Sequence, residues 1–190
     1  MGISMRKLIV VDTETGGLDA RKHSILSVGA VIYQDGAIVG QFSGKVCEPV
    51  LCIDEQALTV TGIKVADIAK FDTPFQVVQA FQQWLLKNEL YGQQTLVAHG
   101  IRFDEPFLRR LWELAGQDFN KQFSHRMLCT QSAALLLNLA GRLDLPAGSA
   151  SLDNVAAVFG FKRDHQHHDA LEDAILTARV LRRLVDRITL

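Results

Sequence analysis

Two β segments near the start of the chain restrict the fold more than any other part of the sequence. Residues 7–12 (KLIVVD) form an apolar run without alternation, which is typical of a strand buried on both faces. Residues 24–46 contain two further apolar runs separated by Asp35-Gly36, a pair that favours a two-residue β-hairpin turn. Three consecutive strands are therefore predicted before the first helix.

The rest of the chain alternates between helical patterns and one more strand. A helix is predicted over 73–87, beginning at Thr73-Pro74, and a fourth buried strand over 95–100. The apolar stripe of this helix is predicted to comprise Phe75, Val78, Phe81, Trp84 and Leu85. Four later helices are predicted at 103–116, 129–141, 151–160 and 169–188. This order of elements predicts one α/β domain over residues 1–190, with a mixed sheet flanked by helices.

Composition and charge limit the kinds of partner and location. With 48% hydrophobic and 22% charged residues, the composition is that of a soluble globular protein. The formal net charge of -1 predicts that any nucleic-acid partner is held by local positive charge rather than by a generally basic surface. The 3 cysteines form no C-x-x-C pair, and no apolar run approaches the roughly 18 residues of a membrane helix. We therefore expect a cytoplasmic protein that does not interact with membranes.

Three acids in the first two-thirds of the chain are predicted to converge. Asp12 and Glu14 lie two positions apart on a strand, so they share a face about 6.6 Å apart along the chain. Asp104 is in helical register with Leu108 and Leu111, which places it on the core side, although the residue also fits a helix N-cap.

The last helix adds a fourth acid and a histidine. Its inward face is predicted to comprise Ala170, Ala174, Thr177, Ala178, Leu181, Leu184, Val185 and Ile188. Asp173 lies at the edge of that face, while Asp169 and Glu172 have the spacing of a capping box. His168 is then the last loop residue before the helix. An acid held rigidly by a helix is thus predicted beside a more mobile imidazole.

These residues predict a metal site of a particular kind. Carboxylates without thiolates suit Mg²⁺ or Mn²⁺ rather than structural zinc. A group of like charges raises its own pKa values unless cations occupy it. The neighbouring His165 and His167 are expected to be solvated loop residues without an assigned role, so the segment HQHHDALED is not predicted to be a zinc site by itself.

Three motifs, VVDTETGGL, VAHGIRFDEPFL and HHDALEDA, occur in the order and at the intervals found in the DEDDh family of 3′-to-5′ exonucleases. The chain resembles this family from about Lys7 to Ile188. The family includes the proofreading epsilon subunit of bacterial DNA polymerase III and ribonuclease T. The resemblance implies a ribonuclease H-like fold with a mixed central sheet of about five strands flanked by helices.

The resemblance also implies a role for individual residues. It implies that two Mg²⁺ ions, for which Mn²⁺ can substitute, are bound by Asp12, Glu14, Asp104 and Asp173. It also implies that His168 is the general base. The substrate contacts that it implies are Thr13, Thr15, Leu18, Thr61, Gly62, Ile63 and His99, with core packing as the alternative role of Ile63. Phe103 is a further candidate, as an aromatic side chain on which a base can stack. Gly100 stands where many relatives have asparagine, and Gly16 stands where a hydroxyl is common. These two departures predict a weaker grip on the substrate.

The leading hypothesis is an exonuclease that removes nucleoside 5′-monophosphates from the 3′ end of single-stranded DNA or RNA. A phosphodiesterase acting on dinucleotides or short oligonucleotides is an alternative, which the absence of net positive charge favours. A third hypothesis is an accessory subunit that binds a polymerase. The resemblance leaves both a homodimer and association with a polymerase open.

Overall fold

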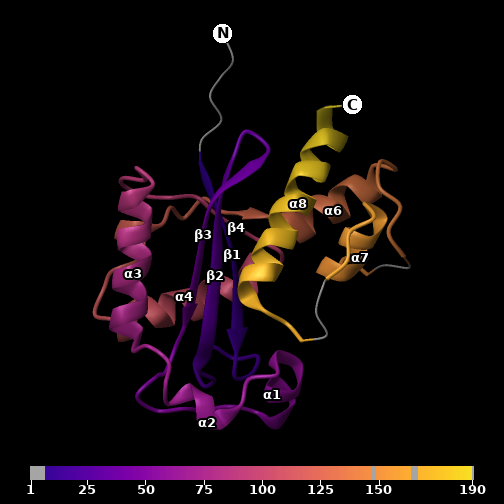
Figure 1. The fold of residues 1–190 in the computed structure, drawn as a ribbon. Coiled ribbons are helices and arrows are strands. Elements are labelled where there is room, and N and C mark those ends of the chain that lie inside the picture. Colours follow the sequence, from indigo (N-terminus) through magenta and orange to yellow (C-terminus); the bar gives the residue numbers. More distant parts are fainter. Residues whose placement is uncertain (1–6, 147–148, 164–166, 190) are drawn as a thin grey trace.

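The computed structural model describes residues 7–146, 149–163 and 167–189, and its centre is a mixed sheet of five strands (Figure 1). The strands are β1 (Leu8–Thr15), β2 (Ile25–Gln34), β3 (Ala37–Lys45), β4 (Leu96–Ala98) and β5 (Leu128–Cys129). They lie in the order β3-β2-β1-β4-β5. The pairs β1–β2 and β2–β3 are antiparallel, whereas β1–β4 and β4–β5 are parallel. The predicted mixed sheet is confirmed.

Three strands differ from the predicted segments. β1 continues to Thr15, beyond the apolar run that ends at Asp12, because it pairs with β2 from Leu8 to Thr15. β4 is shorter than the predicted segment 95–100. β5 has only two residues, too few for a periodic pattern, and its Cys129 lies in the segment that we predicted to be the start of a helix. The predicted hairpin turn is confirmed, since Asp35 and Gly36 both have positive φ angles of 51° and 86°.

Helices cover both faces of the sheet. α3 (Pro74–Lys87) and α4 (Ile101–Leu114) pack on one face, and α8 (Ala170–Thr189) packs on the other (Figure 1). α6 (Thr130–Leu139) and α7 (Leu152–Val158) lie against α8. Three short helices, α1 (Glu55–Thr61), α2 (Val65–Ile68) and α5 (Phe119–Gln122), lie in the connections. No helix among the described residues has the length and apolar character needed to cross a membrane.

The alternation of side chains along β1 divides the core into two layers. Ile9 and Val11 pack with α3 and α4, while Val10 packs with Ala174 and Ala178 of α8. α8 lies very close to the sheet because β2 carries Gly29, where a Cβ would lie 2.2 Å from the Ala170 carbonyl carbon. Gly29 is paired with Asp12 in the sheet register, so the first turn of α8 is held beside Asp12.

The buried sides of two helices differ from the predicted stripes. In α3 the capping box formed by Thr73 is present, but Phe75 is 52% exposed and Val77 is buried instead. α8 has a second buried side, on which Leu176 and Val180 pack against α6 and α7, whereas Ile188 is 60% exposed. A helix that contacts two neighbours buries more than the single stripe that its periodicity indicates.

Candidate active site

β1 carries two acids on the face of the sheet that α8 covers. Asp12 and Glu14 share this face with Val10, which packs against α8. β2 pairs with β1 along its whole length, whereas β4 pairs only with Ile9 and Val10. Among the described residues, the edge of β1 that faces β4 therefore has no neighbouring strand beyond Val10. A cavity opens at this position, next to the carboxyl ends of two parallel strands.

α4 supplies the third acid, Asp104, beside the part of β1 with which β4 does not pair. Asp104 is 3% exposed, and its Oδ1 accepts hydrogen bonds from the Thr13 backbone N–H (3.1 Å) and the Thr13 hydroxyl (2.9 Å). The predicted core-facing register is therefore confirmed. The alternative that Asp104 is the N-cap is wrong, because the helix begins at Ile101 after a left-handed Gly100.

α8 supplies the fourth acid and places the imidazole beside it. Asp169 Oδ1 accepts hydrogen bonds from two backbone N–H groups at the start of α8, so it caps the helix as predicted. Asp173 lies in the first turn, is 3% exposed, and has its Oδ2 3.5 Å from His168 Nδ1. The backbone N–H of His168 donates to the Val60 carbonyl (3.1 Å), which ties this loop to α1.

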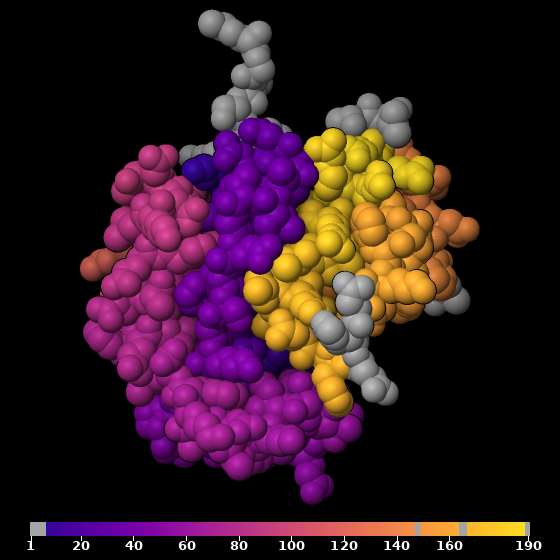
Figure 2. Space-filling view, viewed as in Figure 1, coloured from indigo at the N-terminus to yellow at the C-terminus, as the bar shows by residue number. Residues whose placement is uncertain are grey.

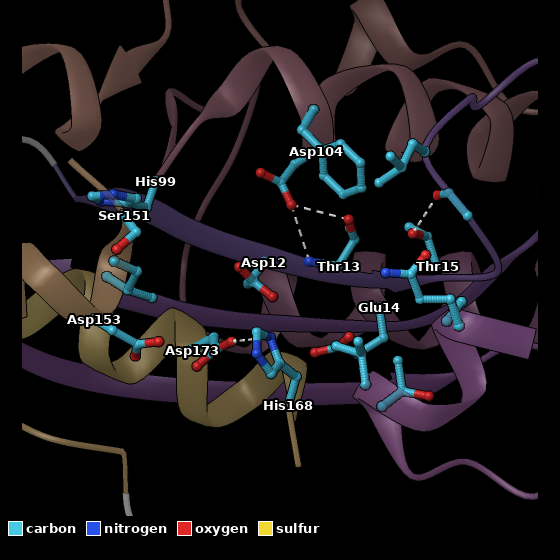
Figure 3. A pocket seen from close by; sticks show the side chains of 18 of the residues that line it. Asp12, Thr13, Glu14, Thr15, His99, Asp104, Ser151, Asp153, His168 and Asp173 are labelled. Carbon is cyan, nitrogen blue, oxygen red and sulfur yellow. Dashed lines mark hydrogen bonds and ion pairs between the residues drawn. The ribbon is translucent and has the colours of Figure 1, made fainter. Parts of the chain in front are cut away.

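All five residues line one cavity of about 530 Å³ (Figure 3). In this view Asp12 lies between Asp104 and Asp173, and Glu14 and His168 border the same space. Residues from three elements that are far apart in the sequence thus converge on one point.

Burial raises the pKa of each of the four carboxyl groups. It raises the pKa of Glu14 to about 8, that of Asp104 to about 7 and that of Asp173 to about 6. The pKa of Asp12 is raised well above its ordinary value, by burial first and then by the three neighbouring carboxylates. Without a cation, part of the site stays protonated near neutral pH, whereas a bound cation favours the charged form.

The donor set fits a hard divalent cation. One ligand atom from each of Glu14, His168 and Asp173 lies within 4.8 Å of the others. Glu14 Oε1 is buried and has no hydrogen-bond partner among the described residues, an arrangement that is costly unless a ligand completes it. Oxygen donors without thiolates suit Mg²⁺ or Mn²⁺.

Two charged residues of the cavity were not predicted from the sequence. Arg163 forms ion pairs with Asp173 Oδ2 (3.2 Å) and with Asp153 Oδ1 (2.8 Å). Its positive charge lowers the pKa of Asp12, Glu14 and Asp173 and so offsets part of the effect of burial. Arg163 lies in an irregular segment, where no periodicity indicates a direction. Its closeness to the histidine-rich stretch was the only signal.

The predicted substrate contacts divide between two hollows. The catalytic cavity is lined by Thr13, Thr15, Leu18, Thr61, His99 and Phe103. Leu18 and Phe103 are 85% and 38% exposed and offer apolar surface at its edge. Gly62 and Ile63 line a neighbouring hollow of about 400 Å³, which shares Thr61 with the catalytic cavity.

Two of these side chains already have partners within the protein. The hydroxyl of Thr13 holds Asp104, as described above. The His99 ring lies between Thr130 Oγ1, 2.9 Å from Nδ1, and the Ala150 carbonyl, 2.8 Å from Nε2. Burial lowers the pKa of His99, and a neutral ring that donates from Nε2 accepts at Nδ1 when the Thr130 hydroxyl points toward it rather than toward the Ala98 carbonyl, 3.3 Å away. Both residues therefore shape the wall of the cavity.

The two glycines that depart from the expected pattern have different structural reasons. At Gly16 a Cβ would lie 2.6 Å from the Cys52 carbonyl oxygen, so the close approach of two backbone segments excludes a side chain. At Gly100 a Cβ would meet only Gln131 Oε1, at 3.7 Å, but the φ of 95° favours glycine.

His167 is the other histidine of the HQHHDALED segment that the structure describes. His167 is exposed, and its ring lies against Gly62. His165 lies outside the described residues. Within the described part of the chain, Glu14, His168 and Asp173 are the one group of three potential ligand residues whose ligand atoms lie within 4.8 Å of one another.

Comparison with known proteins agrees with this geometry. A family model described as an exonuclease (RNase T) matches residues 9–181. The chain is 31% identical over 180 residues to a PolC-type DNA polymerase III of Thermotoga petrophila, covering 94% of this chain and 12% of that protein. It is 28% identical over 174 residues to the corresponding protein of Clostridium perfringens, covering 92% and 11%. The chain thus spans only about an eighth of the length of these relatives.

Solved structures show the same fold. The nuclease domain of 3′hExo, a DEDDh family member bound to rAMP, matches with a TM-score of 0.76 at 20% identity, covering 95% of this chain and 92% of that chain. Exonuclease X in complex with duplex DNA gives 0.67 at 24% identity, covering 96% and 93%. Exonuclease I of E. coli in complex with a dT13 oligonucleotide gives 0.78 at 14% identity, covering 97% and 42%. The predicted ribonuclease H-like fold is therefore confirmed.

Proposed function

The chain belongs to the RNase T family of exonucleases, and from this membership we propose a metal-dependent enzyme that cleaves single-stranded nucleic acid from the 3′ end. The observation that carries the proposal is the convergence of four acids, of which Glu14, Asp104 and Asp173 are buried and Asp12 is half-buried, with one imidazole in a single cavity. Such a set suits the hydrolysis of a phosphodiester bond. We further propose that the chain acts as one exonuclease domain.

The four acids are proposed to hold two Mg²⁺ ions, for which Mn²⁺ substitutes. Bound there, the ions supply the positive charge that activates a water molecule and stabilises the leaving oxygen. Thr13 fixes Asp104 by two hydrogen bonds, and Arg163 orients Asp173 by an ion pair. These contacts keep the carboxylates directed into the cavity.

His168 is proposed to accept the proton of the attacking water. Its Nδ1 faces Asp173, and no hydrogen bond to its Nε2 is found among the described residues, so Nε2 takes the proton. Burial lowers the pKa of His168, which favours the neutral imidazole that can accept a proton. The water oxygen bonds to phosphorus, and the bond from phosphorus to the O3′ of the preceding nucleotide breaks. The terminal nucleoside leaves with the phosphate on its 5′ oxygen.

The cavity favours a terminal nucleotide that is separated from a partner strand. Leu18 and Phe103 present apolar surface on which a base can stack, and stacking requires an unpaired base. Solved neighbours are described in complex with rAMP, with a dT13 oligonucleotide and with duplex DNA, so the fold accommodates both ribose and deoxyribose. Digestion of single-stranded RNA and single-stranded DNA of the same sequence in parallel measures which of the two the enzyme prefers.

A phosphodiesterase of dinucleotides is a second candidate. The cavity of about 530 Å³ and the net charge of -1 are compatible with a short substrate. Association with a polymerase is a further proposal, because the matched relatives are PolC-type polymerases of which this chain covers only 12%. The homodimer and the cytoplasmic location stay predictions.

Digestion of a single-stranded oligonucleotide with a 5′ label tests the proposal. With Mg²⁺, a stepwise ladder is expected from the 3′ end, and Asp12→Ala or His168→Ala is expected to abolish it. Glu113→Ala, on the exposed side of α4, serves as the control and leaves the ladder unchanged. Equal cleavage by the parent and both site variants would refute the assignment. Faster cleavage of dinucleotides in parallel reactions would favour the second candidate.

A further inference from the structure

A stripe of arginines leads away from the active site along α8. This helix holds Asp173 in its first turn, and Arg179, Arg182 and Arg183 follow at spacings of three and four residues. The three arginines are therefore on one side of the helix, and all are exposed. Since the formal net charge of the chain is -1, this stripe is a local concentration of positive charge.

Shared lining residues place the catalytic cavity, two further hollows and this stripe in sequence. Arg163 lines the catalytic cavity and also a hollow of about 140 Å³ that it shares with Lys162 and Arg179. Arg179 in turn lines a hollow of about 330 Å³ with Arg182 and Arg183. Figure 2 shows this side of the molecule, with α8 in yellow exposed between the purple strands β2 and β3 and the orange α7. We call this series of five basic residues the α8 track.

The outer hollow contains a buried hydroxyl whose hydrogen lacks an acceptor. Tyr33 of β2 is 3% exposed, and its hydroxyl lies near the Arg182 guanidinium, which can only donate to it, while no acceptor of ordinary geometry faces it among the described residues. A buried donor without an acceptor is costly, and an oxyanion in the hollow would accept its hydrogen. The hollow therefore combines a free donor with three guanidinium groups.

The positive charge of the track is only partly neutralised. Arg163 pairs with Asp153 and Asp173, and Arg182 pairs with Asp186 (3.2 Å). Glu172 lines the same hollow as Lys162 and Arg179. No ion pair joins Arg179 or Arg183 to another described residue. Arg183 lies over the Phe161 ring, 5.7 Å from its centroid, which fixes it beside the hollow. Guanidinium groups bind phosphate oxygens through paired N–H donors. The chemistry of the track is thus that of a site for phosphate groups.

We propose that the α8 track binds the phosphodiester backbone of the substrate strand behind its 3′ end. The inference rests on the proposed exonuclease function and deepens it, because it makes the substrate an oligonucleotide of several nucleotides. Arg179 and Arg183 lie roughly 9 Å and 15 Å from Asp173 along the helix axis, at 1.5 Å per residue. When the terminal phosphodiester bond of a strand lies beside Asp173, the phosphates that precede it in the strand are close enough to contact Arg179 and Arg183.

Binding of labelled strands to the Arg179→Ala/Arg183→Ala variant tests this inference. Fluorescence anisotropy in EDTA, where no cleavage is expected, compares a strand of roughly 20 nucleotides with a trinucleotide. We expect the Kd of the long strand to rise about tenfold and that of the trinucleotide to stay unchanged. The slope of log Kd against log salt for the long strand is expected to fall by about 1.4, at about 0.7 for each phosphate contact.

Two further variants make the test specific. Lys87→Ala/Lys121→Ala removes the same charge from α3 and α5, away from α8, and is expected to leave both Kd values unchanged. Tyr33→Phe keeps the buried ring and removes the hydroxyl, so the Kd of the long strand is expected to rise about threefold without loss of thermal stability.

The outcomes separate this inference from the proposed function. An unchanged Kd and salt slope for the long strand in the double arginine variant would overturn the inference, and an equal loss in the lysine control would do the same. The parent protein's cleavage of the same strands in Mg²⁺ tests the exonuclease proposal by itself. Arginine-dependent binding without cleavage would support the track and refute the enzyme function.

Discussion

Replacement of Glu14 by glutamine is expected to stabilise the metal-free protein. The pKa of Glu14 is raised from 4.5 to about 8, by burial first and then by the Asp173 carboxylate. A raised folded-state pKa means that the charged carboxylate costs folding free energy as the pH increases. The difference between 4.5 and 8, at about 1.4 kcal/mol per pH unit, corresponds to roughly 5 kcal/mol once the group is fully charged. Glutamine keeps the shape of the side chain and avoids this cost.

Thermal unfolding in EDTA at pH 8 measures the effect. At pH 8 the Glu14 carboxyl is half charged in the folded state, so we expect the free energy of unfolding of Glu14→Gln to exceed that of the parent by about 4 kcal/mol. For a chain of this length, this difference raises the Tm of the variant by about 10 °C. Glu113→Gln, on the exposed side of α4, is the matched control and should leave the Tm unchanged. Saturating Mg²⁺ should reduce the difference in Tm between Glu14→Gln and the parent, because the variant has lost a metal ligand and is stabilised less by the ion. An equal or lower Tm for Glu14→Gln in EDTA would refute the electrostatic cost.

Three other outcomes are expected. In EDTA the free energy of unfolding of the parent should fall as the pH rises from about 4 to about 8, because the raised pKa values of Glu14 and Asp173 give stability that is lost as each group ionises. Urea denaturation measures it, and a rise over this interval would contradict the sign. His168→Gln should lower kcat by about 10²- to 10⁴-fold with unchanged Mg²⁺ affinity in calorimetry, whereas a parallel loss of affinity would make His168 a ligand. Arg110→Met should cost about 3–5 kcal/mol in urea denaturation, because it leaves the buried Glu48, 2.7 Å from Arg110, without its cation. A cost below about 1 kcal/mol would show that Glu48 is satisfied by its backbone donor alone.

The positions of the acids were predictable because each lies on a regular element. Asp12 and Glu14 share a face since a strand alternates with period two, and Asp104 follows the apolar stripe of its helix. Asp169 was recognisable as a cap from its spacing to the residues of the first turn. In each case a local rule fixed the direction of the side chain before any tertiary contact was known.

Features that depend on contacts between distant segments were not predictable in this way. Arg163 lies in an irregular segment, so its ion pair with Asp173 has no periodic signal. The exclusion of a side chain at Gly16 depends on the passage of Cys52 nearby. Likewise, Leu176 is buried only because α6 and α7 pack on the second side of α8. Helical periodicity reports one buried face and is silent about a second neighbour.

The identity of the first product released from a single strand tests the central claim most directly. A short reaction with Mg²⁺ and an oligonucleotide of mixed sequence, analysed by mass spectrometry, should yield the 5′-monophosphate of the 3′-terminal nucleoside, and EDTA should abolish its release. Release of a nucleoside 3′-monophosphate, of the 5′-terminal nucleotide, or of internal fragments would contradict the claim that Asp12, Glu14, Asp104, Asp173 and His168 form a metal-dependent 3′-exonuclease site.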